Sequence, residues 1–202
     1  MGDNDDIGGR VRVADISLLS DNHYVLRKAS FAWRRDDGAW QKQQRESYDI
    51  GDGAAVLPLD PVAGTVLLIR QFRWPVFEAG YRQTLIEVVA GKLDGDDPET
   101  CVTREAVEEA GVAIRELRRV THCFTSPGAV KERLTLFLAR YDAAESREKG
   151  GGHEHEGEDI AVLEMKLDAA LAMIEDGRII DAKTILLLQA ARLAEFAAQR
   201  HG

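Results

Sequence analysis

The stretch GKLDGDDPETCVTREAVEEAGV, Gly91–Val112, contains one helix with clear signals at both ends. Asp97 is a suitable N-cap residue, and Pro98 fits the first turn because its ring fixes a helical φ angle. Gly111 suits the left-handed position that follows many helices. Together these signals predict an α-helix over Pro98–Ala110.

Three carboxylates gather on one side of this predicted helix. Glu105, Glu108 and Glu109 share an arc of about 100°, and small apolar residues fill the opposite side. Like charges at this spacing repel one another, and the helix macrodipole disfavours anions in the last turn. Arg104 can reach Glu108 and orient it. A solvated acidic face would tolerate this arrangement, but oxygen ligands of this kind also suit Mg²⁺ or Mn²⁺.

The composition is that of an ordinary globular protein. The chain has 202 residues, of which 45% are hydrophobic and 30% charged, a size suited to one domain with a small addition. A net charge of −9 argues against a nucleic-acid partner. Two cysteines form no disulfide framework, no apolar run reaches the roughly 18 residues of a membrane-spanning helix, and the acidic N-terminus has no signal-peptide pattern. We therefore expect a cytoplasmic protein with no membrane and no nucleic-acid partner.

Sequence patterns divide the chain near residue 50. Residues 1–9 are polar and Gly-rich and predict a disordered tail. Residues 10–50 contain strand-like runs and a tight turn at Asp36–Gly38, which predict a small antiparallel β-domain. Because this domain has few aliphatic residues, its aromatic side chains could face a partner subunit. Residues 51–202 combine strand-like and helical runs, which predicts an α/β or α+β sandwich with a mixed sheet.

The second region ends in an acidic loop followed by a strand and two helices. The loop, AAESREKGGGHEHEGED at residues 143–159, has a length that is usually functional or disordered. Strands are expected at 54–60, 65–72, 84–91, 117–124, 133–141 and 160–167, and helices at 98–110, 168–177 and 182–199.

The acidic helix carries a family resemblance. The run Arg104-Glu105-x-x-Glu108-Glu109-x-Gly111-Val112 resembles the right half of the Nudix hydrolase box in full. The left half is one residue shorter than the family pattern, and the place of a supporting glutamate falls on Asp96 or Asp97. The resemblance implies an α/β/α sandwich with a mixed β-sheet, preceded here by the small N-terminal β-domain.

The same resemblance implies a metal site. Glu105 and Glu109 would be metal ligands, and Glu108 would bind the metal or support them. The main-chain carbonyl of Ala90, just before the box glycine, would be a further ligand, and Arg104 would hold the glutamates in place. The implied cofactor is Mg²⁺, with Mn²⁺ as a possible substitute.

A late Glu-x-Glu-Asp-Ile segment indicates one particular group within the Nudix hydrolases. It begins at Glu156 and resembles a segment of nucleoside-diphosphate-sugar pyrophosphatases of the ADP-ribose type. The resemblance implies that Glu156 is the general base and Glu158 a further metal ligand; the alternative is an acidic loop without a role. That group exchanges its N-terminal β-domain between subunits, so a homodimer through residues 10–50 is also implied.

Other segments resemble the GDP-mannose pyrophosphatase subgroup, over about residues 15–192. They occur in the same order: LLSDNHYVLRKASF, VLLIRQFR, TSPGAV, the GGG before the acidic loop, and DAKTILLL. The implied reaction is Mg-dependent hydrolysis of the diphosphate bond of a nucleoside-diphosphate sugar, with GDP-mannose giving GMP and mannose 1-phosphate. Hydrolysis of ADP-ribose to AMP and ribose 5-phosphate is the alternative, and a non-catalytic nucleotide-binding module is a remote one.

Several polar residues outside the box are candidates for substrate binding. Arg70 and Arg73 suit bidentate phosphate recognition, unless they are exposed strand-end charges. Glu87 interrupts an apolar strand, which favours contact with substrate or metal-bound water. Lys183 either reaches the substrate or is solvated beside an Asp181 N-cap. The remaining candidates lie in one loop: Ser126, Gly128 and Glu132.

Overall fold

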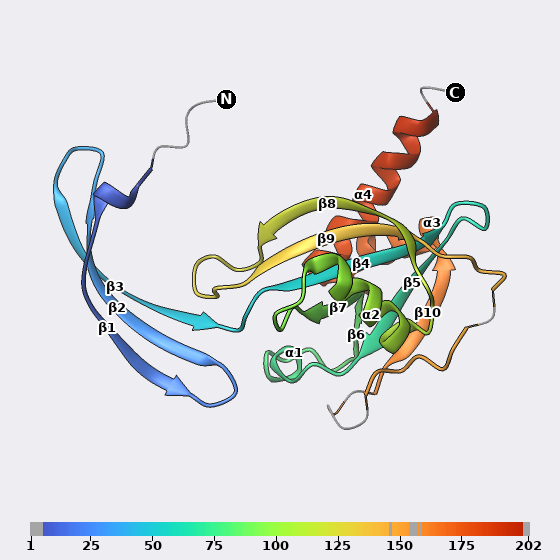
Figure 1. Cartoon of the computed structure of the whole chain (residues 1–202), viewed down its shortest axis with the longest axis horizontal. Helices are drawn as coiled ribbons and strands as arrows, with labels where there is room; N and C mark the ends of the chain where they lie inside the picture. Colours follow the sequence, from blue (N-terminus) through green and yellow to red (C-terminus); the bar gives the residue numbers. More distant parts are fainter. Residues whose placement is uncertain (1–5, 146, 154–156, 158, 200–202) are drawn as a thin grey trace. The chain divides into compact units, whose positions relative to one another are not determined.

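The computed structural model describes residues 6–145, 147–153, 157 and 159–199, with only the backbone of 195–199. The chain forms two compact units (Figure 1): Met1–Gly51 with Ser126–Glu132, and Asp52–Thr125 with Arg133–Gly202. Of the predicted disordered tail, residues 1–5 lie outside the described residues, and Gly8–Arg10 forms a short 3-10 turn, η1.

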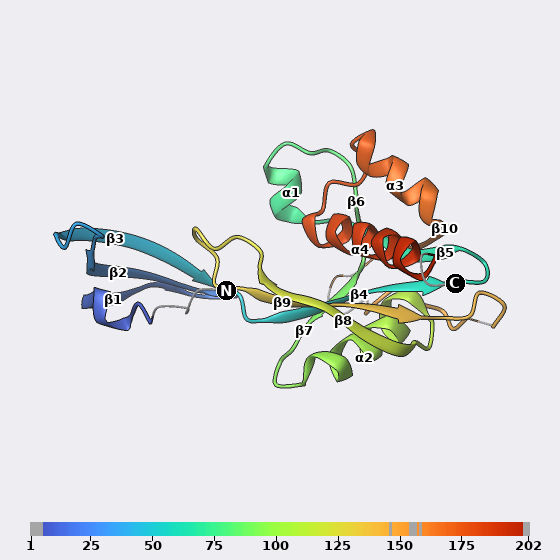
Figure 2. The ribbon, with the colours of Figure 1, turned by 90° about the horizontal axis from the view of Figure 1, so that it is seen from above.

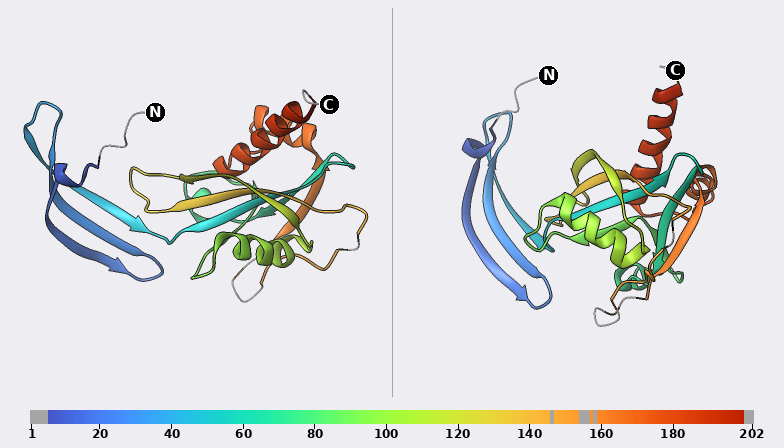
Figure 3. Two further views of the ribbon diagram at one scale, coloured as in Figure 1. Left: turned by 45° about the horizontal axis from the view of Figure 1, so that its top comes forward. Right: turned by 45° about the vertical axis from the view of Figure 1, so that its right-hand side comes forward.

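The first unit is built on a three-stranded antiparallel sheet of long, curved strands (Figure 3). Its strands, in the order β1-β2-β3, are β1 (Val11–Asp21), β2 (Val25–Arg34) and β3 (Trp40–Asp49). The turn between β2 and β3 needs Gly38, whose φ of +83° is in the left-handed region that favours glycine. The predicted antiparallel N-terminal sheet is thus confirmed.

Residues Ser126–Glu132 join the first unit although they lie between strands of the second. The N–H of Tyr48 donates to the carbonyl of Ala129 at 2.8 Å, and the N–H of Lys131 donates to the carbonyl of Tyr48 at 2.8 Å. The Lys131 ammonium also lies 2.8 Å from Asp49 Oδ2. This loop therefore continues the edge of β3.

The second unit contains a seven-stranded mixed sheet. Its main path is β10-β5-β4-β9-β8, while β6 pairs with β5 and β7 with β4. The β4–β9 pair is parallel and the other pairs are antiparallel. The strands are β4 (Gly53–Asp60), β5 (Thr65–Gln71), β6 (Leu85–Glu87), β7 (Val89–Lys92), β8 (Arg115–Phe124), β9 (Arg133–Arg140) and β10 (Ala161–Lys166).

Helices cover both faces of this sheet (Figure 2). On one face lies α2 (Pro98–Ala110), and on the other lie α1 (Trp74–Glu78), α3 (Leu167–Glu175) and α4 (Ala182–Gln199). Two apolar cores result, because alternate residues of β4 face opposite layers: Ala55 and Leu57 pack towards α3 and α4, and Ala54 and Val56 towards α2. The predicted α/β/α sandwich with a mixed sheet is confirmed.

Local signals account for the bounds of α2. Asp97 Oδ1 accepts hydrogen bonds from the N–H groups of Glu99 and Thr100, each at 3.0 Å, as an N-cap does. Gly111 follows the last turn with φ +68°. The prediction of a helix over Pro98–Ala110 is confirmed at both ends.

Asp60 joins the β4–β5 turn to the chain that follows β9. Its Oδ2 accepts from the N–H of Ala143 at 3.0 Å, and its Oδ1 from those of Val62 at 2.8 Å and Ala63 at 3.0 Å. These hydrogen bonds, that of Ala143 first, hold the pKa of Asp60 below its ordinary value. Asp60 therefore stabilises the fold above the unfolded-state pKa of about 3.9, and this contribution is lost as the pH falls through the folded-state pKa.

We expect Asp60→Asn to lower the unfolding temperature at about pH 7, because the amide nitrogen that replaces one oxygen accepts no hydrogen bond. The difference from the wild type should narrow as the pH falls below about 4. Thermal unfolding at about pH 7 and about pH 3 measures both, with the exposed Asp15→Asn as a charge-matched control. A difference that stays constant or widens with acid would contradict this role.

Candidate active site

Helix α2 places two carboxylates against the backbone of β7. Glu109 is only 2% exposed, and its Oε2 accepts the N–H of Ala90 at 3.1 Å. Glu105, one turn earlier, lies so close to Gly91 that a Cβ there would be 2.1 Å from Glu105 Oε1. The absence of a side chain at Gly91 therefore lets Glu105 lie in this position. Since β7 pairs with the buried strand β4, both carboxylates meet a fixed stretch of backbone, Ala90–Gly91.

Arg104 lies between two carboxylates of the same helix, those of Glu105 and Glu108. Its Nη1 lies 3.0 Å from Glu105 Oε1 and 2.8 Å from Glu108 Oε2. Partial burial acts to lower the pKa of Arg104, but Glu105 and Glu108 act in the opposite direction and the net pKa is raised. Glu108 Oε1 also lies 3.5 Å from His153 Nε2. Arg104 thus offsets the repulsion between neighbouring glutamates and orients both, as the resemblance implies.

These residues suit a hard divalent cation. Carboxylate oxygens of Glu105 and Glu109 converge on the Ala90–Gly91 backbone, and carboxylate and carbonyl oxygens are the donors that Mg²⁺ and Mn²⁺ prefer. Among the residues that the structure describes, no three His, Cys, Asp or Glu side chains form a group that could hold a metal ion. The predicted ligand Glu158 lies outside the described residues, as does the predicted base Glu156.

A second charged network is centred on Glu87, the last residue of β6. Glu87 is 2% exposed, forms an ion pair with Lys183 through Oε1, and accepts from Arg73 Nε at 2.8 Å through Oε2. Lys183 also lies 3.0 Å from Asp181 Oδ1. Burial acts to lower the pKa of Lys183, but Glu87 and Asp181 outweigh it and the pKa is raised. Lys183 is thus mostly buried, with 14% of its side chain exposed, and is paired rather than solvated; Asp181 does cap the helix, since its Oδ2 accepts the N–H of Thr184 at 3.0 Å.

Thr184 connects this network to Val88, the residue between β6 and β7. The sequence patterns did not reveal this role. Its fully buried Oγ1 accepts the N–H of Val88 at 2.8 Å and donates to Asp181 Oδ2 at 2.6 Å. The first turn of α4 is thereby attached to the chain two residues before Ala90. Asp181 was visible in the sequence as a possible helix N-cap, but nothing local indicated that Val88 is a hydrogen-bond partner of Thr184.

The structure brings together some of the predicted site residues and separates others. Arg70 is exposed, whereas Arg73 donates to buried Glu87. Ser126, Gly128 and Glu132 belong to the first unit. The residues gathered around β6, β7 and α2 are Arg73, Glu87, Ala90, Arg104, Glu105, Glu108, Glu109 and Lys183.

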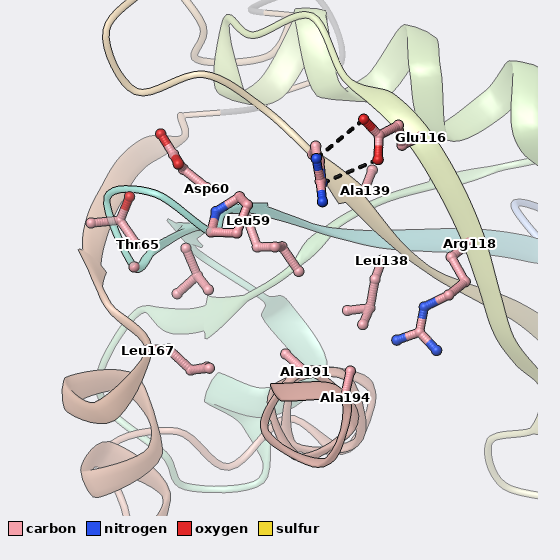
Figure 4. A pocket seen from close by; sticks show the side chains of 14 residues that line it. Leu59, Asp60, Thr65, Glu116, Arg118, Leu138, Ala139, Leu167, Ala191 and Ala194 are labelled. Carbon is pink, nitrogen blue, oxygen red and sulfur yellow. Dashed lines mark hydrogen bonds and ion pairs between the residues drawn. The ribbon is translucent and has the colours of Figure 1, made fainter. Parts of the chain in front are cut away.

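A cavity of about 550 Å³ lies elsewhere in the second unit (Figure 4). It is lined by the ends of β4 and β9, the start of β8, and α4. Arg140 Nε pairs there with Glu116 Oε2 at 3.1 Å, and Arg118 is a further charged residue of the lining. None of the predicted site residues lines it, so the cavity is separate from the carboxylates of α2.

Comparison with known proteins agrees with this geometry. Residues 10–48 match the family described as the GDP-mannose pyrophosphatase NudK N-terminal domain, and residues 50–188 match the NUDIX domain. The chain is 44% identical to the GDP-mannose pyrophosphatase of Pectobacterium atrosepticum, over 90% of this chain and 93% of that one. It is 45% identical to the GDP-mannose pyrophosphatase of Cronobacter sakazakii, over 87% and 92%.

A solved structure shares the fold. The crystal structure of an ADP compounds hydrolase aligns with a TM-score of 0.70 over 95% of this chain and 97% of its own, at 14% identity. The resemblance of the Gly91–Val112 stretch is thus confirmed over most of the chain. With the box glutamates held against β7, these matches show that the chain belongs to the Nudix family of hydrolases.

Proposed function

We propose that this protein hydrolyses the diphosphate bond of a nucleoside-diphosphate sugar, with GDP-mannose as its preferred substrate. The observation that carries the proposal is the convergence of Glu105 and Glu109 on the Ala90–Gly91 backbone. Two relatives named GDP-mannose pyrophosphatase, 44% and 45% identical over most of their length, support the choice of substrate.

The residues proposed to hold Mg²⁺ are Glu105, Glu109 and the carbonyl of Ala90, with Glu108 beside them and Mn²⁺ as a possible substitute. A bound divalent ion neutralises the diphosphate and lowers the pKa of the attacking water. Arg104 orients Glu105 and Glu108 through its 3.0 and 2.8 Å contacts. The fixed position of these carboxylates is what this chain contributes to the charge balance of the transition state.

Substrate phosphate is proposed to contact Arg73. Its side chain is 40% exposed, and its Nε is held by buried Glu87 at 2.8 Å. Glu87 also forms an ion pair with Lys183, so its carboxylate lies between two positive charges. In the proposed reaction, water attacks one phosphorus, the bond from that phosphorus to the bridging oxygen breaks, and the other phosphate leaves. Glu156 stays the predicted base that takes the proton from water.

A homodimer through the N-terminal sheet is part of the proposal. Strand β1 exposes apolar side chains that a monomer would leave in water: Val13, Ile16 and Leu18 are 58–59% exposed. Light scattering of the full chain decides this, since a monomeric mass would contradict it. The cytoplasmic location stays a prediction; among the described residues, no helix is both long and apolar enough to cross a membrane.

The substrate is tested by steady-state kinetics on a panel of sugar nucleotides with Mg²⁺. We expect kcat/KM for GDP-mannose to exceed that for ADP-ribose by at least about tenfold, a difference of roughly 1.4 kcal/mol in transition-state stabilisation. A preference for ADP-ribose of the same size would support the alternative substrate. Turnover of no member of the panel would support the binding-module alternative.

A further inference from the structure

The triglycine segment Gly150–Gly152 lies against the C-terminal turn of α2. The N–H of Gly151 donates to the carbonyl of Glu109 at 2.9 Å, and the N–H of Gly152 donates to the carbonyl of Glu108 at 3.0 Å. Two residues that carry the proposed metal-site carboxylates are therefore held through their main chain by a segment about 40 residues later in the sequence.

These hydrogen bonds satisfy a general need of helix ends. The last carbonyls of an α-helix have no partner within the helix and need donors from elsewhere. In α2, the N–H groups of Gly111 and Val112 donate to the carbonyls of Val107 and Ala106. The carbonyls of Glu108 and Glu109 receive their donors from the triglycine segment instead. The segment thereby fixes the end of the helix where the carboxylates are concentrated.

The approach of the two backbones leaves no room for a side chain. A Cβ on Gly150 would lie 2.6 Å from the carbonyl oxygen of Glu109 and 2.8 Å from both Ala110 C and Gly111 N. All of these are main-chain atoms, which cannot rotate away as a side chain can. From the other side, a Cβ on Gly111 would lie 2.3 Å from the carbonyl oxygen of Glu148. Glycine is thus required on both surfaces.

The triglycine segment lies within the acidic loop, and further contacts involve the residues at both ends of 154–159. His153, directly after the triglycine segment, has its Nε2 at 3.5 Å from Glu108 Oε1. At the other end, the N–H of Ile160 donates to the carbonyl of Gly151 at 3.3 Å. The residues between them include Glu156 and Glu158, which lie outside the described residues. His153 thus contacts α2 directly, and Ile160 contacts the triglycine segment.

We propose that the triglycine segment Gly150–Gly152 is a positioning element of the hydrolytic site. Its N–H groups hold the C-terminal turn of α2, so that Glu108 and Glu109 keep one fixed position. The kinetic part of this inference rests on the proposed function. The hydrogen bonds of Gly151 and Gly152 can be tested without any substrate.

The test compares the wild type with Gly150→Ala. We expect the added Cβ to force the two backbones apart, so that kcat falls by about 100-fold, as for a catalytic group displaced by about 1 Å, while KM stays within about twofold. Amide hydrogen exchange of Gly151 and Gly152, followed by NMR, should change from slow to fast. Gly151→Ala is a second variant whose cost has another source: its Cβ would meet only the Ile160 carbonyl oxygen, at 3.7 Å, but its φ of +126° is one that alanine rarely adopts.

The matched control is Gly64→Ala, at φ +64° in the β4–β5 turn, where an added Cβ meets no atom within 4 Å. It brings backbone strain through its φ angle without a clash against α2, and it should lower the unfolding temperature while keeping kcat. Wild-type kcat in Gly150→Ala, or equal loss in Gly64→Ala, would overturn the inference. Fast exchange of Gly151 and Gly152 in the wild type would overturn it too. Failure of the wild type to hydrolyse any sugar nucleotide would instead overturn the proposed function and leave the exchange measurement to decide the inference.

Discussion

Glu109→Gln is expected to lower kcat by on the order of 10³-fold, the loss of several kcal/mol of charge stabilisation in the transition state. The substitution keeps the shape of the side chain, and the amide oxygen can still accept the Ala90 N–H that Glu109 Oε2 accepts at 3.1 Å. The contact between α2 and β7 should therefore persist. What disappears is the negative charge, which the proposed metal site requires.

Glu99→Gln is the matched control for this variant. Glu99 is an exposed carboxylate in the first turn of the same helix, almost three turns before Glu109. It should retain kcat within about twofold. Calorimetry with Mn²⁺ adds a readout apart from turnover, since Glu109→Gln should weaken metal binding and Glu99→Gln should not. Near-wild-type kcat in a folded Glu109→Gln protein would remove Glu109 from the metal site.

Lys183→Met is expected to lower the free energy of unfolding by about 3 kcal/mol, the usual cost of removing one partner from a buried ion pair. Lys183 has 14% of its side chain exposed and Glu87 has 3%, so the carboxylate would stay buried beside Arg73 alone. Methionine keeps most of the volume of lysine, which separates lost charge from lost packing. Urea unfolding at about pH 7 measures the change.

Two further variants sharpen this measurement. Arg178→Met breaks the ion pair with Asp176, in which both side chains are about half exposed, and should cost less than about 1 kcal/mol. The double variant Glu87→Gln with Lys183→Met removes both charges and should recover part of the lost stability. Equal losses for Lys183→Met and Arg178→Met would show that burial does not strengthen the Glu87–Lys183 pair.

Helix α2 could be predicted to its end residues because every signal for it is local. The Asp97 cap, Pro98 and Gly111 lie within the helix or next to it, and the spacing of the glutamates follows from helix geometry alone. The strands around the two apolar cores were likewise visible as apolar runs. Helix α1, Trp74–Glu78, was not predicted, since five residues are too few to show a helical period.

The partners of the site residues depend on contacts that no spacing records. Glu87 and Lys183 are 96 residues apart in sequence. The apolar residues around Glu87 therefore indicated that its carboxylate needs a polar partner, but not that Lys183 is that partner. The GGG motif was visible only as part of a resemblance. Its contact with Glu108 and Glu109 follows from the way in which the loop after β9 returns to α2.

The identity of the phosphorus-containing products of GDP-mannose tests the central claim most directly. Phosphorus NMR with Mg²⁺ present can follow the reaction of the wild type and of Glu109→Gln side by side. Hydrolysis at the diphosphate predicts GMP and mannose 1-phosphate in equal amounts from the wild type, with little of either from the variant. GDP with free mannose, or no product at all, would contradict it.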